Sequence, residues 1–363
     1  MYEQAVLNHA AKVLMAAANE GRADLALRGY LGGGHASWRE RREITGSVFA
    51  YFRWIRWLDP KESPQRRLAQ AVLLQERFDQ DEKKVKAETL AARAVPEWLH
   101  QEMEVKPEFL RQLQREPSLW LRARPDTRDS LAKKLGGCET TAHAPDALRY
   151  RGDRDLFQTP EFKAGAFEIQ DLASQKVGVA CAPHPGETWW DACAGEGGKT
   201  LHLCDLMGNK GRVWATDRNQ RRLAVLKRRA SRAKLFNVRT ASWNGETKPP
   251  GGTHFDGVLV DAPCSGVGTW QRNPDARWTT AHEDVPELAA IQGRMLGHAC
   301  GSVRPGGRLV YSVCTLTRLE TSAVAEVFTA AHPEFVFQSS DMLWPQDLDS
   351  NGMFIAVWNR ARS

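Results

Sequence analysis

The second half of the chain alternates short apolar runs with longer segments of helical spacing. Apolar runs bounded by turn residues indicate strands buried on both faces, and the amphipathic segments between them indicate helices. The strands are expected at residues 188–191, 212–217, 238–242, 255–261, 308–313 and 353–358, and the helices at 201–207, 220–234, 285–300 and 317–331. This alternation predicts an α/β fold with a mostly parallel, doubly wound sheet of about seven strands.

The first 98 residues show only helical periodicity. Helices are expected at residues 5–19, 23–31, 39–58, 63–78 and 81–94. The third of these places Ile44 and Val48 on an apolar face and arginines on the other, with Trp54 and Trp57 near the arginines. Such tryptophans either stack on nucleic-acid bases or pack in the core beside a solvated arginine face. We predict an all-helical, basic domain and leave both interpretations open.

The segment between these halves predicts a small α+β module. A helix at 107–115, a strand at 118–124, a helix at 127–135 and a short strand at 147–151 are too few for a catalytic α/β domain. They suit an adaptor that faces RNA or packs against the other domains. The predicted domains are therefore residues 1–98 (all-helical), 99–160 (adaptor) and 161–363 (α/β).

Composition and charge narrow the class of partner. The net charge of +6 and the pI near 9 favour a polyanion such as nucleic acid, although many basic proteins have no such partner. The seven cysteines include no CxxC pair and no Cys/His set at zinc spacing, so we expect reduced thiols, no metal and a cytoplasmic location. No signal-peptide pattern or membrane-spanning apolar run is present, so no membrane partner is expected.

Two strands of the α/β domain lead into a cysteine. The apolar run at 258–260 continues into Asp261-Ala-Pro-Cys264, and the run at 309–313 continues into Cys314. Ligands of open α/β sheets bind outside the carboxyl ends of the strands, so both thiols are expected at the active edge of the sheet. Two thiols there indicate thiol chemistry, and the residues alone do not rank the two.

A glycine-rich loop, DACAGEGGKT at residues 191–200, follows the first strand of the domain. Glycines at this position let the backbone approach a ligand at a helix N-terminus. A P-loop needs glycine where Cys193 stands, and the dinucleotide pattern GxGxxG is absent. Asp217 ends the second strand, where an acid binds ribose hydroxyls. Together these features point to S-adenosylmethionine; a structural turn with a capping aspartate is the alternative.

These motifs together resemble the Sun/RsmB family of RNA (cytosine-5) methyltransferases. The similarity covers most of residues 160–363 and is carried by GAFEIQD at 165–171, DACAGEGGKT at 191–200, DAPCSG at 261–266, RNPDARW at 272–278, YSVCT at 311–315 and GMFIA at 352–356. Residues 23–31 and 38–44 resemble the NusB-like domain that precedes some bacterial rRNA methyltransferases. The resemblance implies a Rossmann-like, S-adenosylmethionine-dependent methyltransferase domain behind an all-helical NusB-like domain and the small α+β module.

The chain departs from the family pattern near the expected cofactor. The family usually reads Ala-Pro-Gly-Gly-Lys where this chain has Gly195-Glu196-Gly-Gly-Lys199, and Asn244 stands where an acid usually follows the third strand. The family's Glu-Asn after the second cysteine is Glu320-Thr321 here. By resemblance, the cofactor-binding candidates are Cys193, Ala194, Gly195, Glu196, Gly197, Gly198, Lys199, Asp217, Asn244 and Asp261.

Methylation of cytosine carbon 5 needs a nucleophile because that carbon reacts poorly by itself. A thiolate that adds to carbon 6 turns carbon 5 into an enamine carbon able to take a methyl group, and the thiolate also leaves readily. The resemblance implies that Cys314 is the nucleophile and that Cys264 assists product release. Asp261 is the expected acid beside the base, and Lys199 the expected cation near both the loop and the base.

The expected activity is RNA (cytosine-5) methylation, and the resemblance of the helical N-terminal domain to those of rRNA methyltransferases favours rRNA over tRNA. A flipped base needs contacts beyond the pocket, and Trp270, Arg272, Arg277 and Trp278 follow Cys264 with the mixture of rings and cations that suits RNA. The basic helix at 220–234 either contacts RNA or is a solvated face. A tRNA methyltransferase and a non-catalytic RNA-binding ribosome-assembly factor are the rival interpretations.

Overall fold

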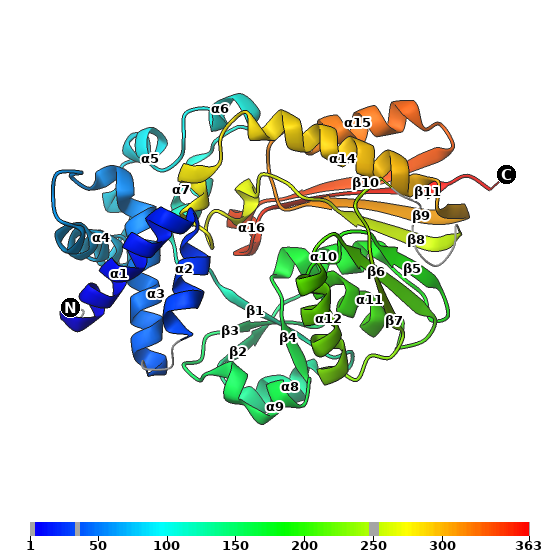
Figure 1. Ribbon diagram of the computed structural model, residues 1–363, viewed down its shortest axis with the longest axis horizontal. Coiled ribbons are helices and arrows are strands. Elements are labelled where there is room, and N and C mark those ends of the chain that lie inside the picture. The colour runs from blue at the N-terminus through cyan, green and yellow to red at the C-terminus, as the bar shows by residue number, and fades with distance from the viewer. Residues whose placement is uncertain (1–3, 33–36, 247–253, 363) are drawn as a thin grey trace. The chain divides into compact units, whose positions relative to one another are not determined.

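The computed structural model describes residues 4–32, 37–246 and 254–362 (Figure 1). Two compact units divide the chain: one contains residues 1–117 and 269–282, and the other contains 118–268 and 283–363. This grouping differs from the three predicted ranges, because residues 99–117 join the helical unit and the small module shares a unit with the α/β domain. The domain boundaries at residues 98 and 160 therefore stay predictions. No helix in the described ranges is long and apolar enough to cross a bilayer.

The helical unit has no strand among its described residues, which confirms the all-helical prediction. Its helices are α1 Gln4–Glu20, α2 Ala23–Leu31, α3 Trp38–Trp54, α4 Pro64–Gln80, α5 Ala87–Arg93, α6 Leu99–Glu102, α7 Pro107–Gln114 and α13 Ala276–Thr279. α3 begins at a capping box, in which the Ser37 hydroxyl accepts from the Glu40 amide and the Glu40 carboxylate accepts from the Ser37 amide. Such a cap contributes about 1 kcal/mol and fixes where the helix begins. The likeness to NusB stays a prediction.

Trp54 lies in the core of the helical unit. Its ring is fully buried and meets Phe78 and Trp57 edge-on, and its indole nitrogen donates to Gln75 at 3.1 Å. Arg53 is also buried and donates to the same amide oxygen at 3.3 Å. The core interpretation is therefore confirmed for Trp54, and the arginine face of α3 is not solvated along its whole length.

The second unit is built on a seven-stranded sheet of order β10-β11-β9-β8-β5-β6-β7. Its strands are β5 Thr188–Asp191, β6 Arg212–Asp217, β7 Val238–Ser242, β8 Phe255–Asp261, β9 Val303–Val313, β10 Phe335–Leu343 and β11 Met353–Arg360. Strands β5 to β9 run parallel, and β11 lies antiparallel between β9 and β10. The predicted Rossmann-like, doubly wound α/β fold is confirmed.

β10 is the strand that periodicity did not predict. Among its residues only Phe335 and Leu343, at its two ends, are buried, and the middle is exposed and partly polar. β10 is an edge strand, so its backbone pairing with β11, and not a buried apolar face, holds it in place. β9 begins at Val303, earlier than expected, because Pro305 and the two glycines after it read as a turn.

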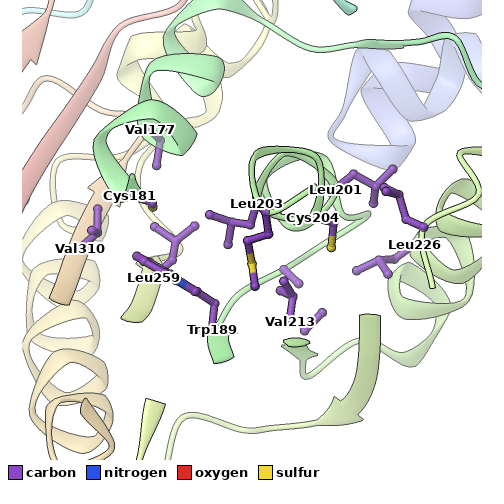
Figure 2. Packing of buried hydrophobic residues seen from close by; sticks show 14 of the residues in the cluster. Val177, Cys181, Trp189, Leu201, Leu203, Cys204, Val213, Leu226, Leu259 and Val310 are labelled. Carbon is purple, nitrogen blue, oxygen red and sulfur yellow. The ribbon is translucent and has the colours of Figure 1, made fainter. Parts of the chain in front are cut away.

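Helices cover both faces of this sheet. α10 Leu172–Cys181, α11 Gly198–Leu206 and α12 Gln220–Arg232 pack on one face, and α14 Asp284–Cys300 and α15 Ser322–Ala331 pack on the other, while the short α16 Pro345–Leu348 follows β10. Successive residues of a strand point to opposite faces of the sheet. Leu259 packs in the core under α10, α11 and α12, whereas Val258 and Val260 pack in the core under α14 and α15. Figure 2 shows Leu259 among side chains of α10 and α11. Full burial of one such side chain contributes about 2 kcal/mol.

A four-stranded antiparallel sheet of order β2-β3-β1-β4 forms the small module of this unit. Its elements are β1 Leu119–Ala123, α8 Arg128–Leu135, β2 Cys138–Thr140, β3 Ala147–Tyr150, α9 Pro160–Lys163 and β4 Phe167–Ile169. The α+β prediction is confirmed. β4 lies beyond the predicted end of the adaptor at residue 160, because a strand of three residues leaves little periodicity in the sequence.

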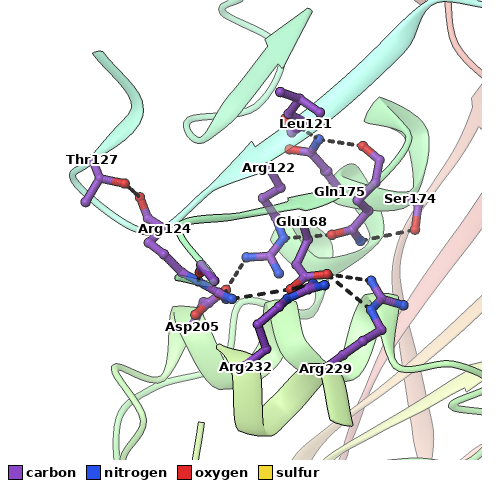
Figure 3. A network of polar contacts seen from close by, with 12 residues as sticks. Leu121, Arg122, Arg124, Thr127, Glu168, Ser174, Gln175, Asp205, Arg229 and Arg232 are labelled. Atoms are coloured by element: carbon purple, nitrogen blue, oxygen red, sulfur yellow. Dashed lines mark hydrogen bonds and ion pairs between the residues drawn. The ribbon is translucent and has the colours of Figure 1, made fainter. Parts of the chain in front are cut away.

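Buried ion pairs join the small module to the helices of the main sheet (Figure 3). Arg122 of β1 pairs with Asp205 of α11. Glu168 of β4 accepts from Arg229 at 2.9 Å and from Arg232 at 2.6 Å, both on α12. Burial opposes the charge of Glu168, but the two arginines hold its pKa below the usual value. Loss of either partner would leave a buried charge uncompensated, so the network ties the module to the sheet.

Candidate active site

The carboxyl ends of the parallel strands bring the predicted residues to one edge of the main sheet. β5 ends at Asp191, β6 at Asp217 and β8 at Asp261, and Cys314 follows directly on β9. Asp261 lies opposite Ser312 of β9 in the strand register. The edge therefore combines three carboxylates with a thiol, where ligands of such sheets bind.

Cys264 and Cys314 lie in contact at this edge. Their Sγ atoms are 3.4 Å apart, both side chains are partly buried, and neither cysteine forms a disulfide. The amide of Gly268 donates to the Cys314 carbonyl at 3.1 Å, and a Cβ on Gly268 would lie 2.1 Å from the Gly352 carbonyl oxygen. The close approach of these backbones, which only glycine allows, holds the loop after Cys264 against Cys314.

The contact separates the ionisation of the two thiols. The hydrogen bond with Cys314, burial, and the negative charge of Cys314 raise the pKa of Cys264 well above its usual value. A thiol at Cys264 can therefore donate a hydrogen bond to the neighbouring sulfur.

Lys199 and Asp261 form the charged pair of the site. The Lys199 ammonium lies 2.8 Å from Asp261 Oδ2, and Asp261 Oδ1 accepts from the Ser312 hydroxyl at 2.8 Å. Burial works against the charge of Lys199, but Asp261 and then Cys314 raise its pKa above the usual value. The ammonium therefore stays charged near Cys314, where a cation favours the thiolate.

The glycine loop closes on Asp217. The amides of Gly195 and Asn219 donate to the two carboxylate oxygens of Asp217 at 2.9 and 2.7 Å. Gly195 has a φ of +54°, and the space where a side chain would stand is open, whereas Gly197 at φ +90° packs tightly against Leu226. The backbone of the loop is therefore accessible at Gly195, beside the Asp217 carboxylate, which can still accept further hydrogen bonds. This combination fits a cofactor that contains a nucleoside.

The remaining loop candidates differ in exposure. Cys193 is partly buried, and burial raises its pKa well above the usual value, which disfavours the thiolate form. The Ala194 amide donates to the Thr216 carbonyl at 2.8 Å, and Gly198 begins α11. Glu196 is exposed, and its carbonyl accepts from Arg229 at 2.8 Å. These residues shape the loop through their backbones.

Asn244 lies two residues beyond Ser242, which is opposite Asp217 in the strand register. Its side chain is exposed, and its amide oxygen accepts from the Glu246 amide at 3.1 Å. The residue follows the third parallel strand as expected, and its role at the cofactor stays a prediction.

Two buried carboxylates at the site were not singled out by the sequence. Asp191 accepts from the Thr200 hydroxyl at 2.6 Å, while its other oxygen has no partner in the described part of the chain. Burial raises the pKa of Asp191 to about 7. Glu320 lies fully buried between the loops of Cys264 and Cys314. A glutamate near the start of a predicted amphipathic helix is expected to be exposed. The match of Glu320 to the family motif was therefore its only signal in the sequence.

The segment predicted to contact RNA packs instead inside the helical unit. Trp270 and Arg277 are fully buried, Arg277 donates to Gln114 at 3.0 Å and to backbone carbonyls, and the Trp278 indole donates to a carbonyl of α3 at 2.8 Å. Burial lowers the pKa of Arg277 well below its usual value. Of the four residues only Arg272 is exposed. The RNA interpretation is therefore wrong for Trp270 and Arg277, which are part of the core of this unit.

The basic helix α12 contains two kinds of cation. Arg229 and Arg232 pair with Glu168 and serve the internal network. The exposed cations of the predicted 220–234 helix are Arg221, Arg222, Lys227, Arg228 and Lys234. RNA contact through this exposed set stays a prediction.

Comparison with known proteins places this site in a family. A profile described as 16S rRNA methyltransferase RsmB/F matches residues 179–358. The probable ribosomal RNA small subunit methyltransferase B of Synechocystis is 36% identical over 241 residues, covering 63% of this chain and 54% of that protein. That of Bacillus subtilis is 39% identical over 178 residues, covering 48% of this chain and 39% of that protein. The chain spans about half the length of these relatives.

Solved structures share the fold. The crystal structure of PH0851 has a TM-score of 0.82 at 22% identity and covers 99% of both chains. A methyltransferase homologue from Pyrococcus horikoshii has a TM-score of 0.63 at 25% identity and covers 70% of this chain and 90% of that one. With its Rossmann-like sheet and the matched segment at 179–358, the chain belongs to the RsmB/F methyltransferase family.

Proposed function

We propose that this protein methylates carbon 5 of a cytosine in RNA, with rRNA as the substrate and S-adenosylmethionine as the methyl donor. The observation that carries the proposal is the contact of Cys264 with Cys314, 3.4 Å apart beside the Lys199–Asp261 pair. A methyl acceptor that is already nucleophilic needs no thiol, whereas carbon 5 needs one sulfur to add and benefits from a second when that sulfur leaves.

The cofactor would occupy the glycine loop. The open backbone at Gly195 allows close approach, Asp217 would accept hydrogen bonds from ribose hydroxyls, and Asn244 would contact the adenine. When bound, S-adenosylmethionine supplies an electrophilic methyl group on a sulfonium. The Asp217 carboxylate already accepts from the Gly195 amide, so the same side chain would fix the conformation of the loop and bind the cofactor.

Cys314 would add to the target ring. Its thiolate, favoured by the Lys199 ammonium, forms a bond to carbon 6, and the electron pair of the ring double bond becomes available at carbon 5 for the methyl group. Asp261 would stabilise the activated ring. Its carboxylate is fixed for that role by Lys199 and Ser312.

Cys264 would assist the release of the product. Loss of the carbon 5 proton to a base re-forms the ring double bond and expels Cys314 as a thiolate. Cys264 remains protonated and lies 3.4 Å from that sulfur, so it can donate a hydrogen bond to the leaving charge. The two sulfurs would thus take different roles in one reaction.

An assay with labelled methyl groups tests the proposal. The protein is incubated with methyl-labelled S-adenosylmethionine and either unmodified small-subunit rRNA or bulk tRNA, and the digested RNA is analysed for 5-methylcytidine. We expect label in rRNA as 5-methylcytidine. Label in tRNA alone would reassign the substrate, and tight RNA binding with no label would support a non-catalytic assembly factor.

A further inference from the structure

Glu320 binds both of the loops that carry the thiols. Its carboxylate accepts from the Ser265 amide at 2.8 Å and from the Ser265 hydroxyl, directly after Cys264. It also accepts from the hydroxyls of Thr315, directly after Cys314, at 3.3 Å and of Thr317 at 2.7 Å. One carboxylate therefore spans the two loops whose sulfurs meet.

A second layer of hydrogen bonds fixes Glu320 itself. Gln292 of α14 donates to Glu320 at 2.9 Å and to the Pro263 carbonyl, just before Cys264, at 2.9 Å. The Tyr311 hydroxyl, from β9, lies 2.6 Å from the Glu320 carbonyl oxygen and 3.0 Å from the Gln292 amide oxygen, and it can donate its one proton to either of them. Glu320 is fully buried, so each of these donors is a contact that water does not replace.

We propose that Glu320 is a positioning residue that holds the Cys264 and Cys314 loops in register, so that the Cys264 thiol donates to the Cys314 sulfur during product release. The carboxylate suits this task because it is an acceptor only, and all the groups aimed at it are donors. An amide in its place would keep the shape but would turn an N–H group toward those donors.

The charge of Glu320 supports the same division of labour. Together with the Cys314 contact and burial, the Glu320 charge contributes to the raised pKa of Cys264. Glu320→Gln is therefore expected to weaken both the geometry and the protonation of the Cys264 thiol. Glu320→Asp keeps the charge but shortens the reach, and is expected to retain more function.

Thiol alkylation measures this role without RNA. Iodoacetamide labelling of each cysteine peptide is followed by mass spectrometry as a function of pH. In the native protein we expect Cys314 to react at lower pH than Cys264, and in Glu320→Gln we expect the Cys264 midpoint to move to lower pH. Glu168→Gln, which removes another buried carboxylate in the small module, is the matched control and should leave both midpoints in place.

The release step gives a second readout, and this arm alone rests on the proposed function. Glu320→Gln is expected to slow release of the protein–RNA adduct about tenfold while cofactor affinity stays unchanged. Native alkylation midpoints in a folded Glu320→Gln protein would overturn the proposal, whether or not RNA is methylated. If that variant does not melt cooperatively, Ser265→Ala replaces it: slower adduct release supports the proposal, and native release overturns it.

Discussion

The sulfur of Cys264 lies 3.4 Å from the sulfur of Cys314, and this contact raises the pKa of the Cys264 thiol. Such asymmetry between neighbouring identical groups is how a site obtains a nucleophile and a hydrogen-bond donor from the same residue type. The first two predictions test this relationship directly.

Substitution of the two cysteines should give opposite phenotypes. Cys314→Ala removes the nucleophile and should abolish both methyl transfer and adduct formation. Cys264→Ala leaves attack and methyl transfer possible but slows release, so a denaturant-resistant protein–RNA complex should accumulate on a denaturing gel. Trapping by Cys314→Ala would reverse the roles, and near-normal turnover by Cys264→Ala would reduce Cys264 to a packing residue.

Mild oxidation should join the same pair. A thiolate at Cys314 attacks one oxygen of hydrogen peroxide and breaks the O–O bond to give a sulfenic acid and hydroxide, and the Cys264 thiol then displaces the sulfenic hydroxyl group as water to form a disulfide. We expect loss of two hydrogen atoms by intact mass, loss of activity, and recovery of both thiols with dithiothreitol. Cys264→Ala is the control and should instead take up oxygen irreversibly at Cys314. A reversible disulfide at Cys138, which is also partly exposed, would contradict the expected selectivity.

Asp217→Ala should weaken S-adenosylmethionine binding. The variant loses the acceptor for the ribose and also the anchor of the Gly195 amide, at a cost of about 1–3 kcal/mol in binding free energy. Titration calorimetry measures the change, with Asn244→Asp as a companion that should retain binding. Unchanged affinity in Asp217→Ala would remove this residue from the cofactor site.

Arg277→Met should destabilise the helical unit. The substitution removes a buried cation from Gln114 and from backbone carbonyls, leaving acceptors unpaired at a cost of about 3 kcal/mol in unfolding free energy. Arg272→Met, five residues earlier and exposed, should be near neutral in the same urea titration. Equal stability of the two variants would show that Arg277 does not contribute through its hydrogen bonds.

The pH dependence of stability should reveal Asp191. Its pKa is about 7 in the fold and about 4 in an unfolded chain, so the native state binds more protons between these values. Stability from this group is therefore present below about pH 4 and is lost as the pH rises through about 7. Asp191→Asn should lose less stability than the native protein between pH 5 and pH 8 in chemical denaturation. Parallel pH profiles would contradict the raised pKa.

Sequence periodicity predicted the parallel part of the main sheet because those strands are buried on both faces. Asp261 and Cys314 could be placed at its edge from strand ends alone. The edge strand β10 has no such pattern in its sequence, because its pairing with β11 depends on backbone hydrogen bonds, which do not require particular side chains. The direct contact of the two thiols needed the fold, because it depends on the distance between two sulfurs fifty positions apart, whereas their ranking rests on the family resemblance.

Polar residues in the core were the main source of error. Arg277 and Trp270 are predicted from the sequence to contact RNA because arginine and tryptophan beside the Cys264 loop suit that role as well as they suit a core. What decides between the roles is whether acceptors such as Gln114 lie within reach, and α7 that supplies it is remote in sequence. The role of Glu320 could not be predicted for the same reason, because its hydrogen-bond donors come from three separate segments.

The path of the chain has a consequence for how the protein is made. The polypeptide passes between the units at 117/118, 268/269 and 282/283, so the helical unit recruits a segment that is synthesised late. When residues 1–117 have left the ribosome, the acceptors that Arg277 will bind are still empty, and they stay so until β5, β6, β7 and β8 have been translated. The helical unit is therefore completed only after β5 to β8 of the seven-stranded sheet have been translated, and nascent chains that stop before residue 282 lack part of its core.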